Sequence, residues 1–127
     1  MSIDITFEGA KNLLRDVVSE RGEYFVYFLR VDSPYGSNGC SYVHEDADGN
    51  LTPGCGVGLA LINAGVPMQK FIDLGINFGF GTSSALHALQ CAGVLGEIEN
   101  GVWEVFSDFQ AKQDAGFSYG ECLSPIL

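Results

Sequence analysis

Apolar residues recur every three or four positions near the start of the chain: Phe7, Ala10, Leu13, Leu14, Val17 and Val18. This is the spacing of one face of an α-helix. Thr6 can cap the first turn, and Gly22 follows the last apolar position. The pattern predicts a helix over residues 7–21.

A different pattern follows at residues 24–31, a continuous run of aromatic and β-branched residues without helical period. Such a run is typical of a strand that is covered on both faces. Turn-forming residues at 32–39 then predict that the chain reverses and returns as a second strand over residues 39–44. We therefore expect an antiparallel hairpin with a long loop.

The rest of the chain reads as helices separated by turns. After a polar turn at 45–50, Thr52 and Pro53 provide an N-cap and a first helical residue for a helix over 53–64. Three further helices are predicted: a short one over 67–74, one capped by Thr82 or Ser83 that continues to about residue 92, and one from Val102 that fades before Gly116.

Together these elements predict an α+β fold, a short antiparallel β-hairpin packed against about four to five helices. A chain of 127 residues fits one domain, and no repeat or linker divides it, so we expect a single domain over 1–127. With 46% apolar and 17% charged residues the composition is that of a globular protein.

The net charge of −10 is distributed unevenly. Residues 31–127 contain eleven acidic residues against Lys70 and Lys112. This field disfavours nucleic acid and anionic membrane surfaces as partners and suits a basic protein. The start of the chain has no signal-peptide pattern, so we expect a cytoplasmic protein whose four cysteines (Cys40, Cys55, Cys91 and Cys122) are free thiols.

Glycines at alternate positions, Gly54, Gly56 and Gly58, mark the predicted start of the second helix. Unobstructed amides at a helix start can hold a phosphate or carboxylate. The spacing is neither that of a P-loop nor that of a dinucleotide fingerprint. The alternative is that small residues let this helix lie close against the hairpin.

Aromatic residues could stack on a planar ligand such as a nucleobase. Tyr42 and the glycine-flanked Phe78 and Phe80 are the candidates, with Arg30 as the cation for a phosphate. Core packing, or a subunit interface formed by the two phenylalanines, is the alternative.

Metal binding and catalysis have weaker support. Cys40, His44 and Cys55 do not follow a known zinc spacing, so thiol packing is the preferred interpretation. His87 lies within a helix, and the acidic turn of Glu45, Asp46 and Asp48 lacks the distal glutamate of a calcium loop. We expect no metal, no cofactor and no catalytic residues.

Several short motifs recur in one known family. They are Val17-Val-Ser-Glu-Arg21, Glu23-Tyr-Phe-Val-Tyr27, Cys40-x-Tyr42-Val43, Pro53-Gly-Cys-x-Val-Gly58, Ala64-Gly-Val-Pro67 and Gln110-x-x-Gln113-Asp114-x-Gly116. On these motifs the chain resembles a family of small accessory proteins of actinobacteriophages, mycobacteriophages among them. Residues 75–101 match that pattern poorly.

The resemblance implies a phage protein that acts in the host bacterial cytoplasm, and such proteins often counter host defences. The residues above then suggest a non-enzymatic, homo-oligomeric protein that sequesters a small nucleotide-like signal. One alternative is an acidic inhibitor that mimics nucleic acid and blocks a host protein. A small nucleotide-cleaving enzyme is the other alternative.

Overall fold

The computed structural model describes residues 2–27, 41–77 and 81–127 of the chain. Within these ranges it contains six α-helices and four short strands, which confirms the α+β class. The helices are α1 (Phe7–Arg21), α2 (Gly56–Asn63), α3 (Met68–Asp73), α4 (Thr82–Cys91), α5 (Val102–Asp114) and α6 (Tyr119–Leu123), with a 3-10 turn at Ser124–Ile126. The strands are β1 (Ile3–Ile5), β2 (Val43–Glu45), β3 (Leu51–Pro53) and β4 (Leu95–Ile98).

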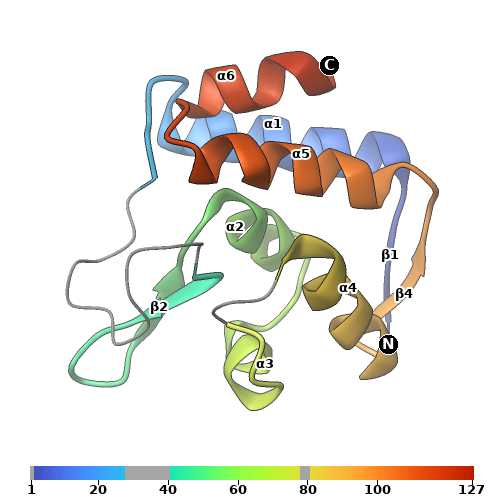
Figure 1. Cartoon of the computed structure of the whole chain (residues 1–127). Helices are drawn as coiled ribbons and strands as arrows, with labels where there is room; N and C mark the ends of the chain where they lie inside the picture. Colours follow the sequence, from blue (N-terminus) through green and yellow to red (C-terminus); the bar gives the residue numbers. More distant parts are fainter. Residues whose placement is uncertain (1, 28–40, 78–80) are drawn as a thin grey trace.

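Helix α2 lies at the centre of the helical packing and contacts both α1 and α5 (Figure 1). Its first six residues, Gly56–Leu61, are all buried, so it carries no polar face. Helix α6 lies across α1 and α5 on the side away from α2, while α4 packs against α5. A helix that is apolar all round belongs in the interior, and this explains the position of α2.

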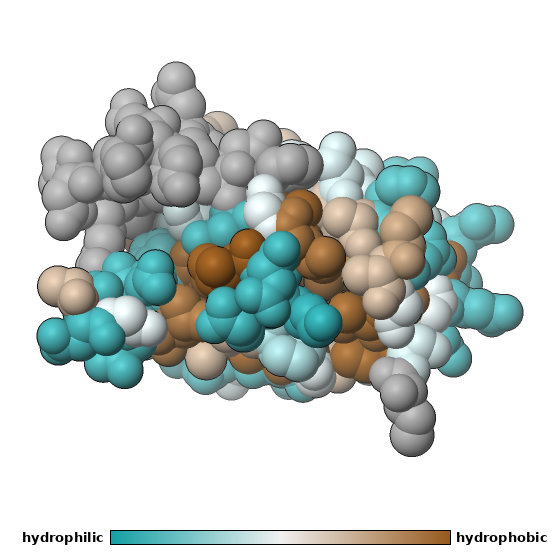
Figure 2. All heavy atoms as spheres, turned by 90° about the horizontal axis from the view of Figure 1, so that it is seen from below, coloured by the Kyte–Doolittle hydropathy of each residue, from teal (hydrophilic) through white to brown (hydrophobic). Residues whose placement is uncertain are grey.

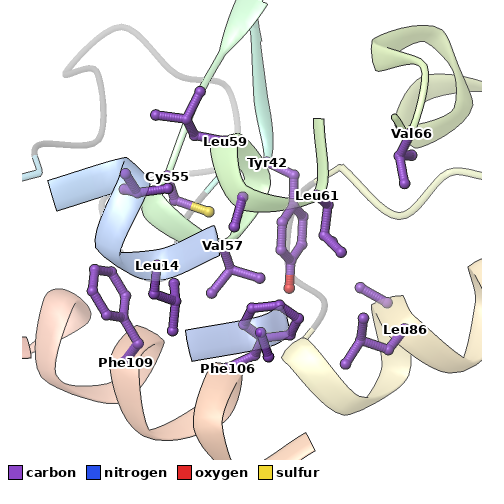
Figure 3. Close-up of a cluster of buried hydrophobic side chains, with 14 of the residues drawn as sticks. Leu14, Tyr42, Cys55, Val57, Leu59, Leu61, Val66, Leu86, Phe106 and Phe109 are labelled. Atoms are coloured by element: carbon purple, nitrogen blue, oxygen red, sulfur yellow. The ribbon is translucent and has the colours of Figure 1, made fainter. Parts of the chain in front are cut away.

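The core gathers side chains from every layer around α2. Leu14 from α1, Val57 and Leu61 from α2, and Phe106 and Phe109 from α5 converge in one cluster (Figure 3). On the face seen in Figure 2, by contrast, apolar surfaces are interrupted by polar side chains. None of the helices in the described ranges combines the length and the apolar character that crossing a bilayer would require.

The hairpin forms at a different place from the one expected. Strand β2 pairs antiparallel with β3, with His44 opposite Thr52, around the polar turn at 46–50. The Asp46 carboxylate closes this turn, because its Oδ1 accepts from the backbone amides of Asp48 and Asn50, both at 2.9 Å. The predicted strand over 24–31 is wrong at its described end: Tyr24 is 85% exposed, and residues 24–27 are not in a strand. Residues 28–40 lie outside the described ranges.

Helix boundaries agree with the sequence where a local cap decides them. The Thr6 side chain accepts from the Gly9 amide and starts α1, as predicted. The start of α2 was predicted too early, because Thr52 and Pro53 pair with β2 and the helix begins only after the N-cap Cys55. Helix α4 is preceded by Gly81 as N-cap, in place of Thr82 or Ser83.

Two strands and one helix carried no recognisable sequence pattern. Strands β1 and β4 form a parallel pair that joins the start of the chain to the segment before α5. Each has only three or four residues, too few for a period to show. Helix α6 lies in the weakly patterned tail and is held by a capping box between Ser118 and Glu121.

Candidate functional site

Three successive amides at the glycine-rich start of α2 are not free to bind a ligand. The Gly54 amide donates to the Tyr42 carbonyl at 2.9 Å, and the Cys55 amide donates to the Ser41 carbonyl at 2.9 Å. The Gly56 amide donates to Oε1 of Gln113 at 2.8 Å. Three successive donors that could hold an anion therefore bind groups of the protein itself.

Close packing explains why these positions are glycines. A Cβ atom on Gly54 would lie 2.1 Å from the Ser41 carbonyl oxygen, and one on Gly58 would lie 2.2 Å from the Tyr42 carbonyl oxygen. A Cβ atom on Gly56 would lie 2.5 Å from the Phe109 ring. The alternative offered by the sequence, a helix lying close against the hairpin, accounts for Gly54 and Gly58, which meet the backbone just before β2, whereas Gly56 meets α5.

Tyr42 is part of the core. Its side chain is fully buried, its ring stacks on Phe71 with centroids 5.5 Å apart, and it points into the cluster beside Val57 and Leu61 (Figure 3). The structure therefore does not present Tyr42 to a ligand. Arg30, Phe78 and Phe80 lie outside the described residues, so their part in binding stays a prediction.

The candidate metal ligands Cys55 and His44 differ in burial and in the groups that they contact. Cys55 is buried at the N-cap of α2, and Nε2 of the half-buried His44 lies 2.9 Å from the Tyr27 hydroxyl. Cys40 lies outside the described residues. Within the ranges that the structure covers, no three potential ligands are close enough to hold a metal ion.

A partly buried polar network that the sequence did not reveal links α1 and α6 to the start of α2. The Arg21 guanidinium donates to the carbonyls of Gly54 and Pro53 and, at 3.3 Å, to the Tyr119 hydroxyl. That hydroxyl donates in turn to Oε1 of Gln113 at 2.8 Å. Burial raises the pKa of Tyr119 far above its ordinary value, so the phenol stays protonated and can donate.

An open hollow lies where the first turn of α4 meets the second half of α5, and we call it the α4–α5 hollow. Its volume is about 320 Å³, at the lower end of the range for small-ligand sites. It is lined by Gly81, Thr82, Ser83 and Ser84 from the start of α4 and by Ser107, Gln110, Ala111 and Asp114 from α5. Four of these residues carry hydroxyl groups and none carries a positive charge.

Gln110 forms the floor of the α4–α5 hollow. Only 8% of the residue is exposed, and its Oε1 accepts from the Thr82 hydroxyl at 2.6 Å and from the Tyr42 hydroxyl at 3.4 Å. Among the described residues no group accepts a hydrogen bond from its Nε2. Every fully buried side-chain nitrogen or oxygen of those residues has a hydrogen-bond partner. The amide nitrogen is therefore not fully buried, and Gln110 lines the hollow.

The first turn of α4 adds further donors. The first backbone hydrogen bond of this helix runs from the Ala85 amide to the Gly81 carbonyl, and Gly81 provides no side-chain cap. The amides of the first turn, at Thr82, Ser83 and Ser84, have no acceptor within the helix. They add the partial positive charge of a helix N-terminus.

Asp114 provides the acceptor at the other side of the hollow. Its carboxylate accepts from Nε2 of Gln113 at 3.0 Å. Burial raises the pKa of Asp114, an effect larger than the opposite one of this hydrogen bond. The hollow thus has several hydrogen-bond donors on one side and one partly desolvated carboxyl on the other. This arrangement suits a ligand that carries hydrogen-bond acceptors next to donors.

The hydroxyl run Thr82-Ser83-Ser84 was the only sequence signal for this site, and it was interpreted as helix capping. Gln110 gave no signal, because only the fold brings it beside Thr82. Comparisons with protein-family models, with curated proteins and with solved structures found no match to this chain.

Proposed function

We propose that this protein acts by binding rather than by catalysis and sequesters a small nucleotide-like signal, with the α4–α5 hollow as the recognition site. The observation that carries the proposal is the Nε2 group of Gln110, which has no described partner and belongs to a largely buried residue that lines that hollow. An unused donor on a side chain that is otherwise buried is costly unless solvent or a ligand satisfies it.

The lining favours recognition of a nucleobase over recognition of a phosphate. No lysine or arginine lines the hollow, and Asp114 would repel an anion. A base edge instead carries acceptors next to amino or imino donors. The acceptors match Gln110 and the first-turn amides of α4, and the donors match the Asp114 carboxyl. With about 320 Å³ the hollow suits a base or a nucleoside.

The biological role that we propose rests on the resemblance to actinobacteriophage accessory proteins. In that setting a protein that binds a nucleotide signal would deprive a host defence of its trigger in the bacterial cytoplasm. Such a role requires tight binding and no chemistry.

The first experiment identifies the ligand. Protein purified without a tag is heat-denatured, and the supernatant is examined by mass spectrometry for retained nucleosides and nucleotides. Calorimetry with a panel of nucleosides, cyclic nucleotides and ADP-ribose-type compounds follows. We expect one class to bind and to be recovered intact. A chemically altered compound would favour a nucleotide-cleaving enzyme, and no heat from any of them would reject the proposal.

A matched pair of alanines on α5 tests the place of binding. Ala111 lines the hollow, whereas Ala115 is exposed at the C-cap of the same helix and does not line it. Ala111→Trp should weaken binding by at least about ten-fold, which corresponds to ~1.4 kcal/mol. Ala115→Trp should leave it unchanged, and equal effects of the two variants would contradict the assignment of the hollow.

A second candidate function is supported by the acidic surface. Glu97, Glu99, Glu104 and Asp108 are exposed around the start of α5, and none of them forms an ion pair with a described residue. A surface of unpaired carboxylates suits a basic protein partner, whose binding would weaken steeply with salt. Glu104→Lys with Asp108→Lys should abolish such a complex and leave nucleotide binding in the hollow intact.

A further inference from the structure

His87 and Cys91 stand one turn apart on α4 and are both exposed. Nε2 of His87 lies 3.4 Å from Sγ of Cys91. This pair is separate from the core cysteines: Cys55 and Cys122 are buried, and burial raises the pKa of Cys122 to about 11. Among the described cysteines, Cys91 alone is open to solvent.

The separation of the two atoms matches two ligands of one zinc ion. Zinc binds imidazole nitrogen at about 2.0–2.1 Å and thiolate sulfur at about 2.3 Å, and tetrahedral geometry then places the two ligand atoms about 3.5 Å apart. The observed 3.4 Å is close to this value without any change of rotamer. The helix therefore holds the pair ready to chelate a soft or borderline divalent cation.

One chain provides only half of a closed site. A structural zinc site has four protein ligands, and no third ligand lies near this pair in the described part of the chain. A two-fold axis beside α4 would bring an identical pair from a second copy, because a two-fold interface places the same surface on both partners. The result is a site of two cysteines and two histidines.

The charge distribution favours contact between copies at this helix. The chain carries a net charge of −10, yet no charged residue occurs from Leu74 to Gly96. The exposed residues of α4 are Ser83, Ser84, His87 and Cys91. Two acidic copies repel each other least where such an uncharged face is turned to the partner.

We propose that His87 and Cys91 form half of a zinc-class site that a second copy of this chain completes, so that the cation links two chains through α4. As the sulfur–metal bonds form, each Cys91 thiol loses its proton to solvent and each His87 imidazole binds in its neutral form. The inference is independent of the proposed nucleotide binding.

Cobalt(II) titration of the reduced, tag-free chain tests the site, with zinc as the competitor. We expect a thiolate-to-cobalt charge-transfer band and the intense visible bands of a tetrahedral centre, saturating at one ion per two chains. Zinc should abolish these bands and double the molecular mass measured by light scattering.

Cys91→Ser and His87→Gln should each remove the bands and the mass increase. Cys40→Ser is the control, because Cys40 is one of the two cysteines that the sequence offered as metal ligands. Bands that survive in Cys91→Ser, or that disappear in Cys40→Ser, would overturn the assignment. Saturation at one ion per chain without a change in mass would overturn the shared site, as would the absence of any band in the unaltered protein.

Discussion

The starts of α2 and α4 are two helix N-termini with the same local chemistry and opposite surroundings. In neither helix does the N-cap residue accept a hydrogen bond through its side chain, and both N-cap residues are small, Cys55 in one case and Gly81 in the other. At α2 the two amides before the helix, of Gly54 and Cys55, and the first helical amide, of Gly56, all have partners within the protein. At α4 the first-turn amides have no acceptor within the helix and border an open hollow.

A glycine-rich helix start therefore indicates close approach but does not show which group approaches. At α2 the approaching groups are the Ser41 and Tyr42 backbone and the Phe109 ring. At α4 a Cβ atom on Gly81 would meet nothing within 4 Å. A ligand can therefore reach the second site, whereas the protein itself fills the first.

The largest expected effect is a loss of stability when one methyl group is added at the start of α2. The same addition at the start of α4 should have little effect. Gly58→Ala would place its Cβ 2.2 Å from the Tyr42 carbonyl oxygen, a backbone atom that cannot move alone. We expect a loss of at least about 3 kcal/mol in the free energy of unfolding. Gly81→Ala, in open space and at a φ of −65°, should cost less than about 1 kcal/mol. Urea denaturation of both variants measures their free energies of unfolding. Similar losses of stability would contradict the difference between the two helix starts.

The next effect concerns the polar group that caps α2. Gln113→Leu keeps the volume of a buried side chain but leaves the Gly56 amide and the Tyr119 hydroxyl without their acceptor. We expect a destabilisation of about 2–3 kcal/mol, because two buried donors lose their bonds. Hydrogen exchange should speed up at the Gly56 amide in particular. An unchanged exchange rate there would mean that Gln113 does not cap α2.

A smaller effect is expected at α4. Thr82→Val removes the hydroxyl that donates to Oε1 of Gln110 at 2.6 Å. The Tyr42 hydroxyl still reaches the same oxygen, so we expect a loss of only about 1 kcal/mol in thermal or urea unfolding. The carboxamide would also be less firmly oriented, so ligand affinity in the α4–α5 hollow should fall. A loss of stability with full affinity would show that the Gln110 amide does not contact the ligand.

The smallest effect is the pH dependence of Asp114. Because its folded pKa is raised, the native state binds more protons than the unfolded state just above the ordinary aspartate value. This contribution to stability therefore decreases as pH rises through that window. Asp114→Asn should stabilise the protein at neutral pH by less than about 1 kcal/mol, since the residue is only partly desolvated and solvent screens its charge, and should have no such effect at low pH. Urea unfolding at both pH values tests the sign.

The local parts of the fold were predictable from sequence for a local reason. The amphipathic repeat and the Thr6 cap predicted α1 over residues 7–21, as observed. The apolar stripe before Gly116 predicted α5, and Gly116 has the positive φ of 94° that lets glycine follow a helix end. Such features depend on residues within a turn or two of one another.

Strand pairing and the burial of side chains could be recognised only in the tertiary structure. Strand β3 was taken as a helix start because Thr52 and Pro53 have cap-like chemistry, and only their pairing with β2 excludes it. The α4–α5 hollow depends on Gln110 and Thr82, which lie 28 positions apart and meet through packing of α4 on α5. The sequence alone was enough to place the helices α1 to α5, apart from the early start given to α2, and the charge, whereas α6 and the strand β3 were not recognised. The packing around α2 decided which helix start stays open, because an amide is available only where no other part of the chain reaches it.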